Sequence, residues 1–454
     1  MVEISQIISE QKRFFDSGKT RDYAFRINCL KKLKTAVLAN ERLICSALQA
    51  DLNKPETESY MCEIGIVYDE ISFHIKHLKK WMKNKRVKTP IAQFKSRSFI
   101  SPEPYGVALI MSPWNYPVQL CLSPLIGAIS AGNCAIIKPS SYSPNVSEVI
   151  EKIISQAFSR EYVAVVTGGR EENELLLNEK FDFIFFTGSV AVGKYVMKKA
   201  SENLVPLCLE LGGKSPVIVE KSANLEISAR RICFGKMLNA GQTCVAPDYV
   251  LCQKSVKDKF VEYYKKAVLE FFKGEFSDFP KIINQKHFLR LKNLLVGEKI
   301  IFGGELNENT RFISPTLVEI ENLNSPLMQE EIFGPILPII TFENLDECIE
   351  LINFKPKPLA LYLFTTDKQT EKRVLNGCSF GGGCINDTII HLATPYMGFG
   401  GVGQSGMGAY HGEQSFKTFS HFRSIVKKSF SLDLKMRYRP YTRKKEKIIK
   451  KFLK

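Results

Sequence analysis

The sequence predicts an α/β protein with a parallel sheet, a second α/β unit and a small β arm. The first observation is an alternation of short apolar runs with helix-like stretches (118–131, 144–158, 170–179 and 190–203). The apolar runs are GVALIM (106–111), CAIIKPS (134–140), YVAVVTGG (162–169), FDFIFFTGS (181–189) and VPLCLELGG (205–213). Such runs are typical of strands buried on both faces, and intervening helices connect parallel strands.

The second observation is that helix-like and strand-like stretches alternate again after residue 215. We expect helices at 222–240 and 256–272, and strands at 250–252, 336–341 and 359–365.

The third observation is that the first set of strands ends in polar or glycine-rich segments, which read SPWN, KPSS, FTGS and LELGGK. Ligands of parallel sheets bind at the carboxyl ends of the strands, so these segments are where functional residues are expected.

The flanking segments differ from this pattern. Residues 1–53 and 60–82 have apolar positions at helical spacing, which predicts helices. Residues 83–101 are basic and lack that spacing, which favours an extended arm. A last strand-like stretch near 421–434 is suited to pairing with another subunit.

The charge of the chain is concentrated at its C-terminus. Residues 435–454 hold ten Lys or Arg and one acid, Glu446, so they carry +9 of the total +16. This tail is either a solvated basic end or a segment that contacts an anionic membrane surface. The 434 other residues carry +7 and show no nucleic-acid-binding module, so no nucleic-acid partner is expected.

Cysteine usage and hydropathy bound the cellular setting. The 12 cysteines are scattered, without CxxC pairs or Cys/His metal spacing, so neither a disulfide framework nor a metal site is expected. No apolar run approaches the roughly 20 residues that span a bilayer, and the first 26 residues lack a signal-peptide pattern. We therefore expect a cytoplasmic protein.

Two strand ends have the residues of a nucleotide site. FTGSVAVG (186–193) leads from a strand into a helix, where Gly188, Ser189 and Gly193 let a phosphate approach free amides. KPSS places Lys138 and Ser141 after a neighbouring strand, where a lysine can bind ribose hydroxyls or phosphate. Taken singly, the first motif is equally an ordinary turn, and the second is more often a surface turn.

Three further residues have the chemistry of a nucleophilic site. Cys244, in GQTCVAP, has small or polar neighbours that expose backbone amides near a thiol. Glu210, in LELGGK, points away from its two leucine neighbours, so it is either an exposed strand residue or a general base in a cavity. Asn115, in SPWNYP, has an amide that could donate to an oxyanion, although Asn also serves turns.

A further motif, EEIFGP, contains Glu331 and Phe333. An acid can bind ribose hydroxyls and an aromatic ring can pack on a flat ligand. The alternative is a loop whose phenylalanine fills a core.

In this order and spacing, PWN, KPSS, FTGS, LELGGK, GQTC, EEIFGP and GFGGVGQSG resemble the aldehyde dehydrogenase superfamily over nearly the whole chain. The GQTCVAPDYV and GVGQSGMGAYHGEQSFKTFSH segments are similar to its class 3, or fatty-aldehyde, branch. The resemblance implies an oxidoreductase with a Rossmann-like cofactor domain, a catalytic domain and an oligomerisation arm.

The resemblance also implies roles for the catalytic residues. Cys244 matches the nucleophile, Asn115 the oxyanion donor, and Glu210 the base that activates water. Thiohemiacetal and thioester intermediates would form on the cysteine. Tyr116 is expected near the substrate entrance.

NAD or NADP is the implied cofactor. Lys138 matches the adenosine-ribose contact, and the stretch from Gly188 through Ser189 to Gly193 matches the pyrophosphate turn. Glu331 and Phe333 match the contacts to the nicotinamide ribose and ring.

The implied domains follow the composition changes. Residues 1–82 and 102–208 are expected to bind the dinucleotide, and residues 209–420 to form the catalytic domain. Residues 83–101 and 421–434 are expected to form the oligomerisation arm of a homodimer, and 435–454 the basic tail.

Two departures from the family pattern bear on specificity. Position 141 is Ser where the class 3 pattern usually has Glu, which affects the choice between NAD and NADP. TPYMGFGG differs from the family pattern on the substrate side, where the resemblance implies medium-chain aliphatic or aromatic aldehydes.

Two alternatives to a hydrolytic aldehyde dehydrogenase are a coenzyme A-acylating enzyme, which Glu210 argues against, and a scaffold without activity, which Cys244 argues against.

Overall fold

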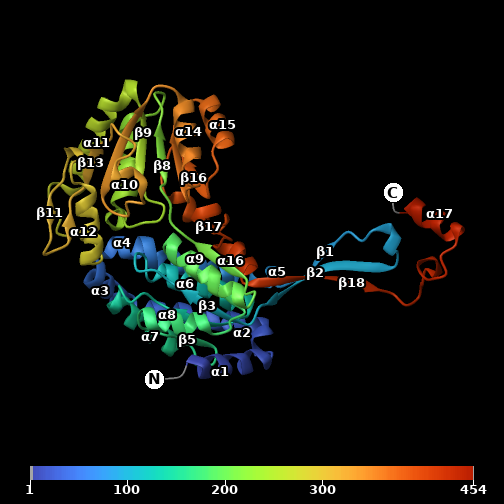
Figure 1. The fold of residues 1–454 in the computed structure, drawn as a ribbon. Coiled ribbons are helices and arrows are strands. Elements are labelled where there is room, and N and C mark those ends of the chain that lie inside the picture. The colour runs from blue at the N-terminus through green and yellow to red at the C-terminus, as the bar shows by residue number, and fades with distance from the viewer. Residues whose placement is uncertain (1–3, 453–454) are drawn as a thin grey trace.

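The computed structural model describes residues 4–452 and contains two large sheets and a projecting arm (Figure 1). The fold class is confirmed: most strand pairs in the large sheets are parallel, and helices connect them. One buried apolar cluster includes residues of both sheets, such as Leu109 and Val217, so the two sheets share a core.

The first sheet has six strands in the order β17-β7-β6-β3-β4-β5. They are β3 (Val107–Met111), β4 (Cys134–Lys138), β5 (Val163–Val165), β6 (Phe183–Thr187), β7 (Leu207–Glu210) and β17 (Gly406–Met407). The first five are parallel, and β17 returns from near the C-terminus to pair antiparallel with β7. The predicted apolar runs are therefore strands, and β7 extends this sheet to Glu210.

Helices accompany this sheet as the sequence predicts. The connecting helices are α6 (Gln119–Ala131), α7 (Pro144–Ala157), α8 (Arg170–Asn178) and α9 (Val190–Glu202). The N-terminal helices are α1 (Ile4–Asp16), α2 (Tyr23–Ala39), α3 (Glu41–Leu52), α4 (Glu56–Ser59) and α5 (Gly65–Trp81), with a π-helical turn at Tyr60–Ile64 before α5. Helix α6 is buried along its whole length, because the sheet, α5 and α16 (Gly412–Thr418) pack around it.

The second sheet has seven strands in the order β10-β13-β14-β9-β8-β15-β16. They are β8 (Pro216–Val219), β9 (Tyr249–Gln253), β10 (Lys299–Phe302), β13 (Thr316–Glu319), β14 (Ile336–Phe342), β15 (Ala360–Phe364) and β16 (Gly382–Ile385). The associated helices are α10 (Leu225–Met237), α11 (Lys257–Phe272), α12 (Gln285–Leu294), α13 (Pro326–Gln329), α14 (Leu345–Phe354) and α15 (Lys368–Gly377). Strands β11 (Leu306–Asn307) and β12 (Phe312–Ile313) form a small separate hairpin.

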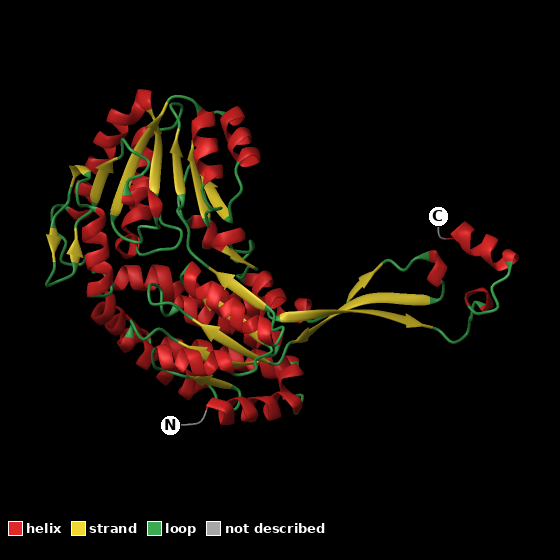
Figure 2. Ribbon diagram, viewed as in Figure 1, coloured by secondary structure: helices red, strands yellow, loops and turns green. Residues whose placement is uncertain are grey.

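The arm is a three-stranded antiparallel sheet that projects from the body (Figure 2). It consists of β1 (Lys85–Val87), β2 (Ser96–Pro104) and β18 (Ser420–Lys428), and it leads to helix α17 (Arg443–Phe452). The predicted strand at 421–434 is thus shorter than expected and ends at Lys428.

One predicted helix is also shorter than expected. The helix predicted over 222–240 is α10, which ends at Met237. Asn239 and Ala240 have φ values of 51° and 50°, in the left-handed region, which a continuing α-helix does not permit. This early end creates the loop that carries Cys244.

Candidate active site

The loop before Cys244 turns sharply over three consecutive residues. Asn239, Ala240 and Gly241 all have positive φ. A Cβ on Gly241 would lie 2.3 Å from the carbonyl oxygen of Gly334, so glycine is needed where this loop meets the EEIFGP segment. The turn returns the chain toward β9 and leaves Cys244 half-buried at its tip.

The surroundings of Cys244 combine two acids with two backbone amides. Burial, with the carboxyls of Glu331 and then Glu210 nearby, raises the pKa of the Cys244 thiol to about 12. The amides of Cys244 and Val245 oppose this rise in pKa, because they hydrogen-bond the thiolate. Two backbone amides thus lie near the sulfur. A thiol in this state needs added positive charge or a proton acceptor before it attacks.

Glu210 is the last residue of β7 and is only 3% exposed, so the exposed-strand interpretation is wrong. Its Oε1 accepts a weak hydrogen bond from the thiol of Cys208 at 3.7 Å. Its Oε2 is buried, and no group within residues 4–452 hydrogen-bonds it. Burial raises the pKa of this carboxyl well above its ordinary value. A carboxyl with a free oxygen and a raised pKa is suited to hold and deprotonate a water molecule.

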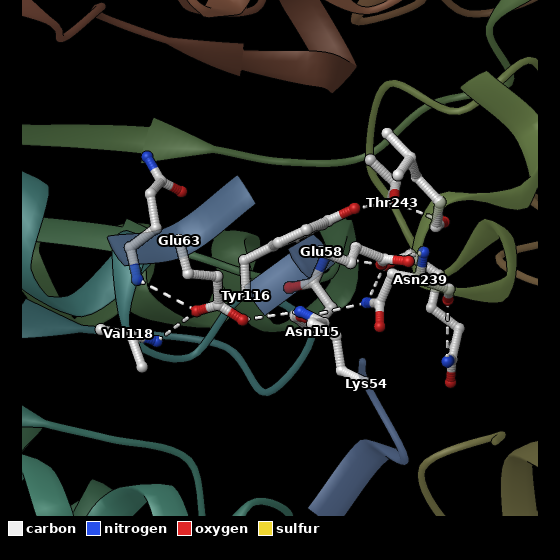
Figure 3. A network of polar contacts seen from close by, with 11 residues as sticks. Lys54, Glu58, Glu63, Asn115, Tyr116, Val118, Asn239 and Thr243 are labelled. Atoms are coloured by element: carbon white, nitrogen blue, oxygen red, sulfur yellow. Dashed lines mark hydrogen bonds and ion pairs between the residues drawn. The ribbon is translucent and has the colours of Figure 1, made fainter. Parts of the chain in front are cut away.

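Asn115 is held in a buried polar network (Figure 3). Its side-chain Nδ2 donates to the carbonyl of Gln242 at 3.0 Å, next to the nucleophile loop. Its own carbonyl accepts from the Nδ2 of Asn239 at 2.8 Å. An amide has two N–H groups, and among residues 4–452 Nδ2 of Asn115 has one acceptor, so its second N–H can serve an oxyanion.

Tyr116 is buried, with 9% of its surface exposed, rather than placed on an open rim. Its hydroxyl lies 2.7 Å from the Oγ1 of Thr243, the residue before Cys244. Burial raises the pKa of this phenol well above its ordinary value, so the group stays neutral. Tyr116 therefore packs directly beneath the nucleophile loop.

The strand-to-helix turn at 186–193 has the predicted form. Ser189 caps α9 by accepting from the amide of Val192 at 3.5 Å, and Ser189 itself is exposed. A Cβ on Gly193 would lie 2.6 Å from the side chain of Leu211, and one on Gly188 would lie 2.6 Å from the ring of Phe186. The glycines thus let α9 begin close to the sheet with its N-terminal amides accessible, as a pyrophosphate requires.

Lys138 is the last residue of β4, and Ser141 lies three residues after it. Lys138 is only 3% exposed, so it is not a surface-turn residue. Its Nζ donates to the carbonyls of Pro139 and Gly168 at 2.9 and 2.7 Å, and burial lowers its pKa. One of its three N–H groups is left for a ligand. Ser141 is exposed.

Glu331 lies near enough to the nucleophile to influence the Cys244 thiol, and Phe333 follows it by two residues. Burial, and then the charge of Asp248, raises the pKa of Glu331 to about 8. Its Oε1 is buried and has no hydrogen-bond partner in the described part of the chain. A Cβ on Gly212 would lie 2.1 Å from Oε2, so a larger residue here would displace this carboxyl. Phe333 is half-buried and packs edge-on against Trp114 at 5.4 Å.

Two charged residues near this carboxyl were not predicted. Lys236 is completely buried on α10, and its Nζ has no hydrogen-bond partner among residues 4–452. Burial lowers its pKa to about 8, although Asp248 and Glu331 favour the charged form. Lys214 forms an ion pair with Asp248. No local sequence pattern identifies Lys236 or Lys214 as a site residue, because the acidic residues near them are distant in the sequence.

The structure describes no cluster of three or more metal-ligating side chains and no helix long and apolar enough to cross a membrane, in both cases among residues 4–452. All 12 cysteines are free. The predicted nucleophile, base and Glu331 lie close enough that both carboxyls influence the thiol.

Comparisons with known proteins identify the family of the chain. The family model described as the aldehyde dehydrogenase family matches residues 2–425. The chain is 50% identical to 4,4'-diaponeurosporen-aldehyde dehydrogenase of Staphylococcus aureus, over 99% of each chain. It is 44% identical to the dimeric NADP-preferring aldehyde dehydrogenase of Canis lupus familiaris, over 97% of this chain and 98% of the relative.

A solved structure described as the substrate-bound state of Staphylococcus aureus AldH superposes with a TM-score of 0.98, at 50% identity and full coverage of both chains. An indole-3-acetaldehyde dehydrogenase complexed with NAD+ superposes with a TM-score of 0.86 at 25% identity, over 94% of this chain and 88% of the other. The site geometry and these matches together place the chain in the aldehyde dehydrogenase family.

Proposed function

We propose that this enzyme oxidises apolar aldehydes to carboxylic acids with NAD or NADP, through a thioester on Cys244 that a Glu210-activated water hydrolyses. The observation that carries the proposal is the arrangement at the thiol. Cys244 has two backbone amides at its sulfur and is influenced by a buried carboxyl, Glu210, which keeps one oxygen free of partners among the described residues.

The first half of the reaction is bond formation at sulfur. The Cys244 thiolate attacks the aldehyde carbon, and a C–S bond forms while the carbonyl oxygen becomes an oxyanion. The free N–H of Asn115 and the backbone N–H of Cys244 donate to that oxygen. NAD or NADP, when bound by the residues described below, would supply the hydride acceptor, and loss of hydride from the former aldehyde carbon would leave a thioester on Cys244.

The second half is hydrolysis. Glu210 takes a proton from water, and the resulting hydroxide attacks the thioester carbon. The C–S bond breaks, the acid leaves, and the thiolate of Cys244 is restored. Since only the ionised carboxyl accepts a proton, the raised pKa of Glu210 predicts that hydrolysis accelerates with rising pH.

The residues present fit a dinucleotide. The exposed start of α9 suits a pyrophosphate, and Lys138 keeps one N–H for a ribose hydroxyl. The buried Oε1 of Glu331 lacks a partner in the described chain, so it can accept from the other ribose. We assign cofactor binding to residues 1–82 and 102–208, and the nucleophile to the domain formed by 209–420.

Product analysis distinguishes this function from coenzyme A acylation. With medium-chain aliphatic or aromatic aldehydes, we expect equal amounts of reduced cofactor and free acid in the absence of coenzyme A. Turnover that requires coenzyme A and yields a thioester product would overturn the hydrolytic assignment. The same panel of aldehydes ranks the substrates.

Ser141 favours use of NADP. A glutamate here would accept from the ribose hydroxyls of NAD and repel a 2′-phosphate. Two unit charges about 4 Å apart interact by about 4 kcal/mol at an effective dielectric of about 20, an upper figure for a solvated cleft. Ser141 is exposed, removes that repulsion and can donate to the phosphate. The canine relative is named NADP-preferring, which is consistent with this assignment.

For Ser141→Glu we expect kcat/KM with NADP to fall at least about 10-fold relative to NAD, because tenfold needs only about 1.4 kcal/mol of the repulsion. Ser141→Ala is the matched control and keeps most of the NADP use. A parent enzyme that strongly prefers NAD, with no further shift in the glutamate variant, would contradict the assignment.

We assign residues 83–101 and 421–434 to the contact of a homodimer, and residues 435–454 to an anionic membrane surface. The arm projects from the body, and the canine relative is named dimeric (Figure 2). Helix α17 exposes Arg443, Lys444, Lys447, Lys450 and Lys451, whereas Ile448 and Ile449 are half-buried. A basic amphipathic helix of this kind binds anionic lipid surfaces.

Vesicle co-sedimentation tests the tail. We expect the full-length protein to pellet with anionic vesicles more than a 1–434 truncation, and less so at high salt because charge attraction is screened. The truncation keeps the arm, so it should remain dimeric in analytical ultracentrifugation. Equal pelleting of the two proteins would contradict the membrane assignment.

A further inference from the structure

A completely buried cation lies behind the Asn115 segment. Lys54 follows α3, and its side chain has no exposed surface. Its Nζ pairs with Oε1 of Glu63 at 2.6 Å, and this carboxyl is also fully buried. The same Nζ donates to the carbonyl of Asn115 at 3.2 Å and lies 4.3 Å from the ring centre of Tyr116. Figure 3 shows the cation among these groups.

The ion pair holds the segment at both ends. While Lys54 binds the carbonyl of Asn115, Oε2 of Glu63 accepts from the amides of Val118 and Gln119 at 2.8 and 3.2 Å. These contacts fix the backbone from Asn115 to the start of α6. The direction of the Asn115 side chain follows from its backbone, so the pair also sets where its amide points.

A second contact joins this segment to the nucleophile loop. Asn239 donates from Nδ2 to the same Asn115 carbonyl, and its backbone amide donates to Oε1 of Glu58 at 2.7 Å. The Asn115 carbonyl therefore accepts from Lys54 on one side and from the Cys244 loop on the other. Removing the cation would leave the Asn115 carbonyl with Asn239 as its remaining donor, and it would leave Oε1 of the buried Glu63 carboxyl without its ion-pair partner.

We propose that Lys54 is a positioning residue, which holds the oxyanion-donating amide of Asn115 in register with Cys244. This inference rests on the proposed role of Asn115. A buried ion pair is a weak contributor to stability compared with apolar packing, so a role in positioning accounts for its place behind the site. Misplacing a reacting group by about 1 Å can cost about 100-fold in rate.

The test is a double-mutant cycle on the full-length enzyme. We expect Lys54→Met to lower kcat/KM for the aldehyde by about 10- to 100-fold, with the Kd for NADP unchanged. Asn115→Ala should lower it by about 100-fold. If Lys54 acts through Asn115, the double variant Lys54→Met/Asn115→Ala is no slower than Asn115→Ala alone.

Gln11→Leu is the matched control. Gln11 is also completely buried, and its Nε2 donates to the carbonyls of Ala135 and Arg160 at 2.9 and 3.1 Å, but it lies on α1. We expect this variant to lose thermal stability without a change in kcat/KM. A control that slows turnover as much as Lys54→Met would overturn the positioning role.

If Lys54→Met does not fold, a second variant provides the double-mutant cycle. Asn239→Gly removes the other donor to the Asn115 carbonyl, and its φ of 51° suits glycine. We expect its effect on kcat/KM to vanish in the Asn115→Ala background as well. Multiplicative losses in either cycle would overturn the inference and leave the role of Asn115 intact. If Asn115→Ala turns over at the parent rate, the oxyanion assignment fails first, and the inference fails with it.

Discussion

Replacing Cys244 with alanine is expected to remove aldehyde oxidation, with a loss on the order of 10⁵-fold or more in kcat, because no other thiol is placed to form the carbon–sulfur bond. Cys244 is half-buried, faces two backbone amides and is influenced by both Glu331 and Glu210. Reduced-cofactor formation measures the loss. The Kd for NADP should stay close to that of the parent, since alanine removes a thiol that its raised pKa keeps uncharged.

Cys384→Ala is the matched control, because Cys384 is also half-buried. This thiol lies 3.5 Å from the Nδ1 of His391, and the carboxyl that helps to raise its pKa is Asp387, not Glu331 or Glu210. We expect it to leave kcat unchanged. A Cys244→Ala enzyme that oxidises aldehydes at the parent rate would show that the nucleophile lies elsewhere.

Replacing Glu210 with glutamine is expected to slow hydrolysis of the thioester by about 10²–10⁴-fold, which is the usual cost of losing a general base. Glutamine keeps the size of the side chain but cannot take a proton from water. Formation of the thioester should proceed, so stopped-flow measurement should show a burst of reduced cofactor near one equivalent per site, followed by slow turnover.

The pH profile provides a second readout for the same variant. Burial raises the pKa of Glu210, so the parent hydrolyses the thioester faster as pH rises toward that value. The glutamine variant should lose this rise. A variant that retains both the steady rate and the pH dependence would show that another group activates the water.

Much of the fold could be predicted because its signals are local. Buried parallel strands such as β3 and β6 read as uninterrupted apolar runs, and Ser189 and Gly193 mark the helix that follows β6. Strand β8 was not predicted: it has only four residues, Pro216–Val219, and directly follows a glycine-containing loop. The early end of α10 was missed because Asn239 and Ala240 adopt left-handed backbone under tertiary constraint, which no propensity indicates.

The site residues also fall into those that local motifs predict and those that depend on tertiary packing. Cys244, Glu210, Asn115 and Glu331 stand in short motifs whose order in the chain carries the family resemblance. Burial was harder to predict: taken alone, Glu210 and Lys138 have the appearance of surface residues, and tertiary packing covers both. Lys54 and Glu63 gave no signal, because their partners at 115–119 come more than 50 residues later.

The most direct test of the account is to identify the covalent intermediate. Glu210→Gln is mixed with NADP and a medium-chain aldehyde, quenched in acid and digested, and the Cys244 peptide is weighed. We expect the acyl group of the oxidised aldehyde on Cys244 at close to one equivalent, and none on the Cys244→Ala/Glu210→Gln enzyme. An unmodified Cys244 peptide during a full burst of reduced cofactor would contradict the thioester mechanism.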